Sequence, residues 1–348
     1  MKKVFNPWKI STLDEEDYNF LKKHFRLANF NFNLTDNPMF SIRNLILGHD
    51  NFDKWLMAAK NGKKVALVSG FMTSGNFHVG SLAVLKQMAY YQQKYNTKIF
   101  IPLADLEAIC VRKIKKEDIN NIVTRFLSHF HAAGLNLDKC NIYLQTQNLD
   151  VLRYASIFTS NINSEDIKKI YDRKMTLGEV FSSLVMVADI LYPQMLSYDK
   201  TLITLGIDEI SHFMLTKELV KKLDYDFPAI TYNKMITGLQ GSKMGKSIPE
   251  NSILLTDSPE TIEFKLNKLR DKKFPLVRNC AFNILQWFCE DDFVIEKITK
   301  EKDMKIANNL AIDNAIKVTK DILRQHQKRY ENFLERAEKI VSTLYRGA

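Results

Sequence analysis

Short apolar runs alternate with amphipathic stretches over the first three quarters of the chain. The runs have the length of buried strands and cover 65–70, 98–103, 141–145 and 202–206. Apolar residues at helical spacing mark the stretches that lie between or after them, at 82–89, 119–130, 177–191 and 211–223. Strands that alternate with helices predict a mainly parallel sheet with helices on both faces. The fold class is therefore a doubly wound, Rossmann-like α/β core.

The two ends of the chain have a different pattern. Residues 1–60 are predicted to be a helical lead-in, because the apolar positions within 14–25 have helical spacing. Beyond Asp257 nearly every segment has helical periodicity, and Ser258 can cap a helix that has Pro259 at its first position. The pattern thus predicts three units, which are a lead-in at 1–60, an α/β domain at 61–257 and a helical domain at 258–348.

Composition narrows the class of protein. No apolar stretch approaches the ~20 residues of a membrane-spanning helix, and the start of the chain lacks the apolar core of a signal peptide, so a cytoplasmic protein is expected. The net charge of +10 favours a polyanionic partner such as nucleic acid, although many basic proteins bind none. The four cysteines show neither Cys-x-x-Cys spacing nor a histidine at zinc spacing, so no metal site is predicted.

A glycine-bearing turn separates the first apolar strand from the helix that follows it, and it reads Ser-Gly-Asn-Phe-His-Val-Gly over 74–80. A helix N-terminus presents unpaired backbone N–H groups and the positive end of the helix dipole, so it attracts phosphate. Gly75 and Gly80 would let a nucleotide approach the backbone, and His78 can hydrogen-bond a phosphate or the adenine-ribose unit. The alternative interpretation is a plain strand-to-helix turn with a surface histidine.

A second motif lies far along the chain, where 241–247 reads Gly-Ser-Lys-Met-Gly-Lys-Ser. Two lysines three residues apart in a glycine-rich loop suit the charge that develops on a departing pyrophosphate. Taken alone, this segment is equally well described as a solvated basic loop. The two motifs in this order, with α/β elements between them, are far more specific than either one.

A third segment, Gly206-Ile207-Asp208-Glu209, follows the strand at 202–206. Ligands of doubly wound sheets bind beyond the carboxyl ends of the strands, which is where both this segment and the turn at 70–80 are expected. Asp208 can accept hydrogen bonds from ribose hydroxyls, and Glu209 can pair with an α-ammonium group. The alternative is that both carboxylates merely stabilise a helix N-terminus.

Together these motifs resemble the tryptophanyl-tRNA synthetases of the archaeal and eukaryotic branch, which belong to class I. Matching stretches run nearly from end to end and include 6–8, 70–81, 104–108, 187–191, 206–215, 241–249, 255–260 and 325–329. The resemblance implies ATP-dependent activation of L-tryptophan to tryptophanyl-adenylate and its transfer to tRNA(Trp). It also implies a homodimer, ATP with Mg²⁺ held by the nucleotide, an RNA partner rather than DNA, a catalytic domain at 61–257 that includes a dimer-forming insertion, and an anticodon-binding domain at 258–348.

The resemblance also assigns roles to individual positions. The catalytic residues it implies are His78, Lys243, Lys246 and Ser247. The nucleotide-binding residues it implies are Gly75, His78, Gly80, Gly206, Asp208 and Met244. The amino-acid-binding residues it implies are Glu107, Ile109, Met186, Asp189, Gln194 and Glu209.

Several positions depart from the family pattern. Ser81 replaces the second histidine of the first motif, Thr73 replaces a proline, Gly245 replaces the serine between the lysines, and Glu209 replaces a glutamine. Gly245 leaves both lysines in place but removes a hydroxyl from the loop.

The amino-acid pocket departs further. In this branch a tyrosine and a glutamine hold the indole N–H, but Ile109 and Met186 stand at those positions and neither accepts a strong hydrogen bond. Asp189 lies nearly one helical turn beyond Met186 and could accept the indole proton instead. Ser182 stands where the tyrosyl pattern has a tyrosine, which argues against tyrosine as the substrate. The alternatives are a tyrosyl-tRNA synthetase, or a paralogue with altered amino-acid specificity or without tRNA charging.

Overall fold

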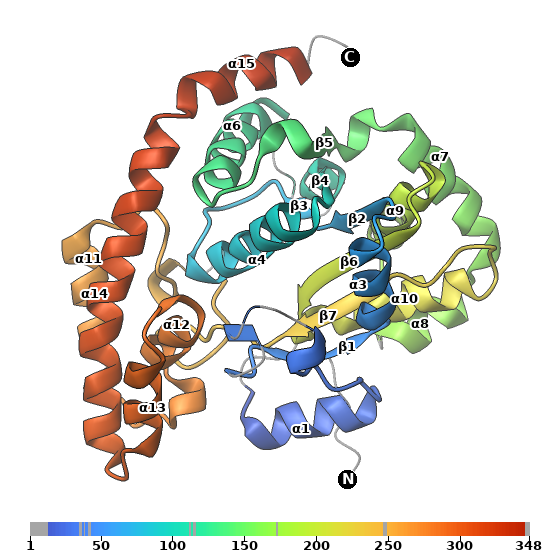
Figure 1. Ribbon diagram of the computed structural model, residues 1–348. Coiled ribbons are helices and arrows are strands. Elements are labelled where there is room, and N and C mark those ends of the chain that lie inside the picture. The colour runs from blue at the N-terminus through green and yellow to red at the C-terminus, as the bar shows by residue number, and fades with distance from the viewer. Residues whose placement is uncertain are drawn as a thin grey trace.

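The computed structural model describes residues 13–34, 37, 39–40, 43–110, 113, 116–171, 173–245 and 249–344, with the backbone alone at 32, 116, 117, 208, 211, 212, 343 and 344. Its centre is a seven-stranded sheet, counted over these residues, that lies between helices (Figure 1). The strands are β1 (Ile46–Asp50), β2 (Val65–Val68), β3 (Phe71–Met72), β4 (Lys98–Ala104), β5 (Cys140–Leu144), β6 (Lys200–Gly206) and β7 (Ala229–Asn233).

The strand order is β1-β7-β6-β2-β4-β3, and β5 also pairs with β4. All neighbours are parallel except β1, which runs antiparallel to β7. Because β2 and β3 pair with successive parts of β4, they form one interrupted strand at the centre of the sheet. The predicted doubly wound α/β core is confirmed.

The helices of the α/β part alternate with the strands. They are α1 (Glu15–His24), α3 (Phe52–Lys60), α4 (Val79–Tyr95), α5 (Asp105–Cys110), α6 (Lys116–Ala132), α7 (Leu149–Phe158), α8 (Ser164–Tyr171), α9 (Leu177–Met195) and α10 (Ile210–Val220). The C-terminal part is helical, with α11 (Pro259–Asn267), α12 (Cys280–Phe288), α13 (Asp292–Lys300), α14 (Met304–Glu331) and α15 (Leu334–Leu344). No described helix is long and apolar enough to cross a lipid bilayer.

The two faces of the sheet belong to two hydrophobic clusters. Successive side chains of a strand point to opposite faces, so Val65 and Leu67 of β2 enter one cluster while Ala66 and Val68 enter the other. Helices α3, α4 and α6 fill the first cluster together with α12 and α14 of the C-terminal part. Helices α1, α7, α9 and α10 fill the second. The C-terminal helices therefore share one continuous core with the α/β part.

The prediction of a purely helical lead-in was wrong. Residues 46–50 form β1, which pairs with β7 and also bridges to Ala28 through His49. The segment Ile-Leu-Gly-His-Asp is neither a long apolar run nor a clean alternation, so its burial depends on pairing with β7, which lies nearly 180 residues away. Strands β3 and β7 were also not predicted.

A buried histidine pair joins the α/β part to the C-terminal helices. His129 Nδ1 of α6 and His326 Nε2 of α14 are 2.9 Å apart, and their rings stack. Because His326 Nδ1 is buried and has no hydrogen-bond partner, we assign the shared proton to His326 Nε2, which leaves Nδ1 as an unpaired acceptor rather than an unpaired donor. Burial, with a smaller contribution from neighbouring charges, lowers the pKa of His129 to about 3 and that of His326 to about 4.

This pair predicts a loss of stability in mild acid. Both folded-state pKa values lie below the value of 6.5 for the unfolded chain, so below that pH the unfolded state binds more protons and is favoured. Each histidine contributes a slope of about 1.4 kcal/mol per pH unit between roughly pH 6 and pH 4. We expect His326→Gln to reduce the fall in urea midpoint between pH 7 and pH 5, measured by circular dichroism. His24→Gln, on the exposed surface of α1, is the control and should keep the parental fall; equal falls in all three proteins would contradict the assignment.

Candidate active site

The strand order places a topological switch between β2 and β6. From β2 the chain continues through β4 to β5 on one side, and it then returns to β6 and β7 on the other side. The carboxyl ends of β2 and β6 therefore border one crevice, which is the usual ligand site in open parallel sheets. The turn at 70–80 follows β2, and Gly206 with the short helix Ile207–Glu209 follows β6. Two of the three predicted segments thus meet at this point.

The turn presents the N-terminus of α4 to this crevice. His78 is the N-cap of α4, and its Nδ1 accepts a hydrogen bond from Ser81 N at 3.4 Å. The neutral imidazole then has its proton on Nε2, which is the donor nitrogen for a phosphate oxygen. A side chain at Gly80 would place its Cβ only 3.0 Å from two atoms of the His78 ring, so the glycine makes room for the imidazole. Gly75 is exposed in the same turn.

Backbone hydrogen bonds join this turn directly to the segment that follows the lysine loop. Leu255 N donates to Phe77 O, and Val79 N donates to Ile253 O, each at 3.0 Å. His78 and Leu254 thereby form an isolated antiparallel bridge. The first motif therefore lies beside the segment at 253–255, which begins six residues after the second motif ends.

The buried side chain of Asn251 holds the backbone of the lysine loop. Its Oδ1 accepts from Gln240 N at 2.7 Å, while its Nδ2 donates to Ser242 Oγ and to Lys243 O, both at 3.0 Å. Gly238 lets Asn251 approach this closely, because a Cβ there would lie 2.3 Å from Asn251 O. The hydroxyl of Ser252 in addition donates to Gly245 O. The first half of the loop is therefore held in one shape by side chains outside the motif.

Lys243 reaches across to the segment after β6. Its Nζ lies 3.2 Å from Glu209 Oε1, and about half of each side chain is exposed. Lys246, Ser247 and the side chain of Asp208 lie outside the described residues, so their predicted roles stay predictions. The ion pair nevertheless connects the lysine loop to the third predicted segment.

A buried tyrosine lies close to the two predicted acids of the amino-acid pocket. Burial raises the pKa of Tyr171 to about 12, and the charges of Glu209 and Glu107 add to the increase. A hydrogen bond with Ser183 of α9 and the charge of Arg173 act in the opposite direction. The charges of Glu107 and Glu209, which follow β4 and β6, therefore both act on the same hydroxyl, and carboxylates of this kind can pair with an ammonium group.

Asp189 lies in a buried polar network at the carboxyl end of β5. Its Oδ1 accepts from Tyr143 Oη at 2.8 Å, and its Oδ2 accepts from Gln145 Nε2 at 2.6 Å. Burial raises the pKa of Asp189 to about 7, although these two hydrogen bonds lower it, and the charge of Asp105 raises it further. The acceptor predicted for the indole proton is therefore already bound on both oxygens.

The remaining amino-acid positions fall into two groups. Ile109 is about one third exposed at the end of α5, and Met186 is half-buried on α9, so both can contribute apolar surface. Gln194 does not join them. Its amide bonds the backbone of Asp226, just before β7, at 2.7 and 3.0 Å, which places Gln194 at the amino ends of the strands, opposite the crevice. The prediction that Gln194 binds substrate was wrong, because its position on α9 carries it past the sheet.

Met244 is buried, unlike the lysine before it in the same loop. Its side chain is only 3% exposed and packs within the hydrophobic cluster that contains the C-terminal helices. It therefore anchors the loop to the core and does not contact a nucleotide through its side chain. A single apolar residue between polar ones in the loop was the available signal for this role.

Sequence reasoning missed three residues that organise the site. Asn251 lies in a polar segment after the loop, and no local pattern marks it as buried. Tyr143 and Gln145 lie within the predicted strand at 141–145. The rule that ligands bind at the carboxyl ends of strands could have drawn attention to Gln145.

Comparison with known proteins agrees with this geometry. Residues 60–345 match the family model described as tRNA synthetases class I (W and Y). The tryptophan–tRNA ligase of Methanopyrus kandleri is 33% identical over 274 residues, which cover 76% of this chain and 72% of that protein. The tryptophan–tRNA ligase of Methanocaldococcus jannaschii is 37% identical over 244 residues, which cover 67% of this chain and 66% of that protein.

The fold of this chain agrees with that of a solved tryptophanyl-tRNA synthetase over nearly the whole length of both chains. The crystal structure of tryptophanyl-tRNA synthetase from Aeropyrum pernix K1 superposes with a TM-score of 0.83 at 28% identity, and the match covers 98% of both chains. The resemblance inferred from the two motifs is confirmed. This chain belongs to the class I tRNA synthetases for tryptophan and tyrosine, groups with the archaeal tryptophan–tRNA ligases, and is an ATP-using aminoacyl-tRNA ligase.

Proposed function

We propose that this chain activates L-tryptophan with ATP to tryptophanyl-adenylate and transfers the amino acid to tRNA(Trp). The observation that supports this most directly is the backbone pairing of 77–79 with 253–255. It joins the N-terminus of α4 to the segment that follows the lysine loop, in a chain of this family, which supports a shared phosphate site for the two motifs. Neither motif provides a covalent nucleophile, so the chemistry depends on positioning and charge stabilisation.

The triphosphate is proposed to lie over the N-terminus of α4. There the first N–H groups of the helix and His78 Nε2 can donate to phosphate oxygens, and Gly75 and Gly80 allow close approach. Gly206 and Asp208 would bind the ribose from the end of β6. The tryptophan carboxylate then attacks the α-phosphate in line, and pyrophosphate leaves toward the lysine loop. The 2′-hydroxyl of the terminal adenosine of tRNA subsequently attacks the carbonyl carbon of the adenylate, which forms the ester bond and releases AMP and a proton.

Lys243 is proposed to change partners during this step. In the structure it pairs with Glu209, and when negative charge develops on pyrophosphate it would pair with the leaving group instead. Glu209 would then be available to the α-ammonium group of tryptophan, together with Glu107. Lys246 and Ser247 are proposed to complete the same clamp. This exchange links substrate binding to closure of the loop.

The remaining assignments follow the family. We propose that residues 61–257 form the catalytic domain after a lead-in at 1–60, and that 258–348 bind the anticodon in the cytoplasm. Mg²⁺ would be held by the phosphates of ATP, and the described residues contain no group of three or more acidic, histidine or cysteine side chains arranged to hold a metal. The net charge of +10 suits a tRNA partner.

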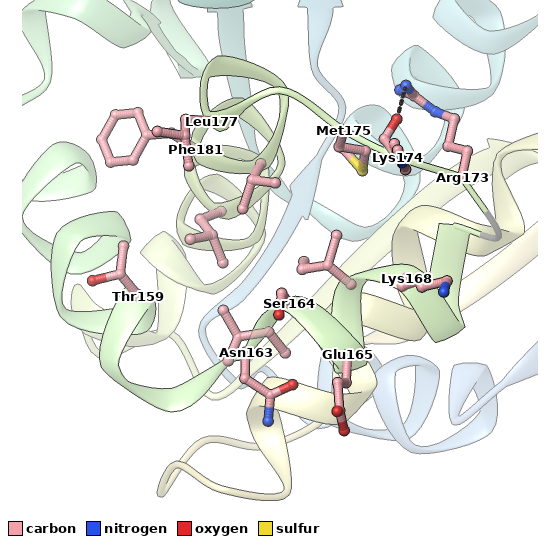
Figure 2. A pocket seen from close by; sticks show the side chains of 14 residues that line it. Thr159, Asn163, Ser164, Glu165, Lys168, Arg173, Lys174, Met175, Leu177 and Phe181 are labelled. Atoms are coloured by element: carbon pink, nitrogen blue, oxygen red, sulfur yellow. Dashed lines mark hydrogen bonds between the residues drawn. The ribbon is translucent and has the colours of Figure 1, made fainter.

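We also propose that two copies of the chain associate through the surface of α7, α8 and α9. A pocket of about 710 Å³ lies there, and none of its lining residues belongs to the predicted site (Figure 2). Leu177 at its rim is 89% exposed, and Ile157 and Leu149 of α7 are more than half exposed. Such a concentration of exposed apolar side chains is typical of a surface that another protein covers. A homodimer is the assembly that the family resemblance implies.

Exchange kinetics test the proposed reaction. The chain should catalyse ATP–pyrophosphate exchange that depends on tryptophan when all twenty amino acids are compared. Exchange with tyrosine instead would overturn the choice of substrate. Exchange without charging of tRNA(Trp) would indicate a paralogue that has lost the second step.

Lys243→Ala tests the role of the loop. We expect the exchange rate constant to fall by about 100-fold or more, because the lysine stabilises charge that is present mainly in the transition state. The dissociation constant for tryptophan, measured by calorimetry, should change by less than about threefold. Lys60→Ala, at the exposed end of α3, is the matched control and should behave like the parent. Equal losses in rate and in tryptophan affinity would contradict this role.

Leu177→Asp tests the proposed dimer surface. A carboxylate at this rim would be desolvated on association, so we expect a monomer in sedimentation velocity at concentrations where the parent is a dimer. Phe293→Asp alters an equally apolar side chain, 69% exposed on α13, and should leave the dimer intact. Loss of the dimer in both variants, or in neither, would place the interface elsewhere.

A further inference from the structure

Gln145 carries a buried polar atom that the network around Asp189 leaves unexplained. The residue begins the short helix Gln145–Gln147 at the carboxyl end of β5 and is only 4% exposed. Its Nε2 donates to Asp189 Oδ2, but its Oε1 is buried and accepts no hydrogen bond from any described residue. Buried acceptors in native proteins normally have a donor, so this oxygen requires an explanation.

The hydrogen bonds determine which way the amide faces. In the structure the NH₂ end of Gln145 donates to Asp189 Oδ2, so Oε1 is directed away from Asp189. Tyr143 of β5 donates to the other carboxylate oxygen and so helps to fix Asp189. Three buried side chains thus hold one carbonyl oxygen in a defined orientation.

This oxygen lies in the part of the molecule where the substrate side chain is expected. Thr146, the next residue, bonds Asp105 just after β4, so Gln145 lies at the same edge of the sheet as the crevice, where the parallel strands end. On α9, Met186 lies nearly one helical turn before Asp189. Ile109 and Met186, at the positions expected to bind the indole, offer no strong acceptor.

We propose that Gln145 Oε1 accepts the indole N–H of tryptophan, and that Asp189 and Tyr143 position the amide rather than bind the ring. This inference depends on the proposed function. An indole nitrogen only donates, which matches a fixed acceptor. A phenol both donates and accepts, and its lone pairs would meet acceptors on Gln145 and Asp189. The trio therefore favours tryptophan over tyrosine at a site without the usual indole-binding pair.

The test uses an analogue that lacks the donor. β-(3-benzothienyl)-L-alanine has nearly the shape of tryptophan, with sulfur in place of the N–H. We expect the parent to prefer tryptophan by about tenfold or more in kcat/KM for ATP–pyrophosphate exchange, because the analogue leaves the buried carbonyl unpaired. Gln145→Met preserves length and volume but removes the acceptor, and it should bring the preference to within about threefold of unity.

Two further variants separate the role of the Gln145 carbonyl from that of the side chains that position it. Tyr143→Phe removes one of the two donors that fix Asp189 but leaves the Gln145 carbonyl in place, so it should reduce the preference for tryptophan less than Gln145→Met does. Gln145→Asn withdraws the carbonyl by one methylene without adding an apolar side chain, and it should lose the preference as Gln145→Met does. A parental preference in either Gln145 variant that folds would overturn the proposal. Absence of tryptophan-dependent exchange in the parent would instead overturn the proposed function.

Discussion

The candidate site depends on a short antiparallel contact between 77–79 and 253–255, made by two backbone hydrogen bonds of 3.0 Å. This contact sets where the lysine loop lies relative to the N-terminus of α4. It is supported from the C-terminal part, because Lys265 bonds both Asp257 and Ser252 O, and Gln327 of α14 bonds the carbonyls of Leu255 and Asp257. Since both lysine and carboxylate are largely buried, removing either would leave an unpaired charge. The helical domain is therefore part of the catalytic geometry.

Charges are distributed unevenly around the crevice. The helix N-terminus and Lys243 suit phosphates, whereas Glu107 and Glu209 suit an ammonium group. Asp189 is different, because both of its carboxylate oxygens already accept hydrogen bonds from buried side chains. Burial raises its pKa to about 7, although these two hydrogen bonds lower it. Tryptophan carries a positive ammonium group and ATP carries a negative triphosphate, so this separation of charge would orient the two substrates without a covalent intermediate.

Local sequence predicted the fold where the periodic signal was long. Strands β4 and β6 and helices α4, α6 and α9 were all anticipated within a few residues, because each gives several turns or alternations of apolar positions. Strand β1 was missed because its five residues show no pattern apart from their pairing with β7. The motif around His78 could be recognised from the sequence because its glycines, its histidine and the start of the helix are consecutive along the chain.

The sequence by itself determined the alternation of strands and helices in the core, the two candidate phosphate-binding motifs and the family, since all of these depend on residue type and spacing along the chain. Tertiary structure alone decided which polar groups meet. It placed Gln194 at the wrong end of the sheet for substrate, buried Met244, and bound Asp189 between Tyr143 and Gln145. The reason is that hydrogen-bond partners are set by where strands end and helices cross, and those positions follow from packing of the whole sheet rather than from any local pattern.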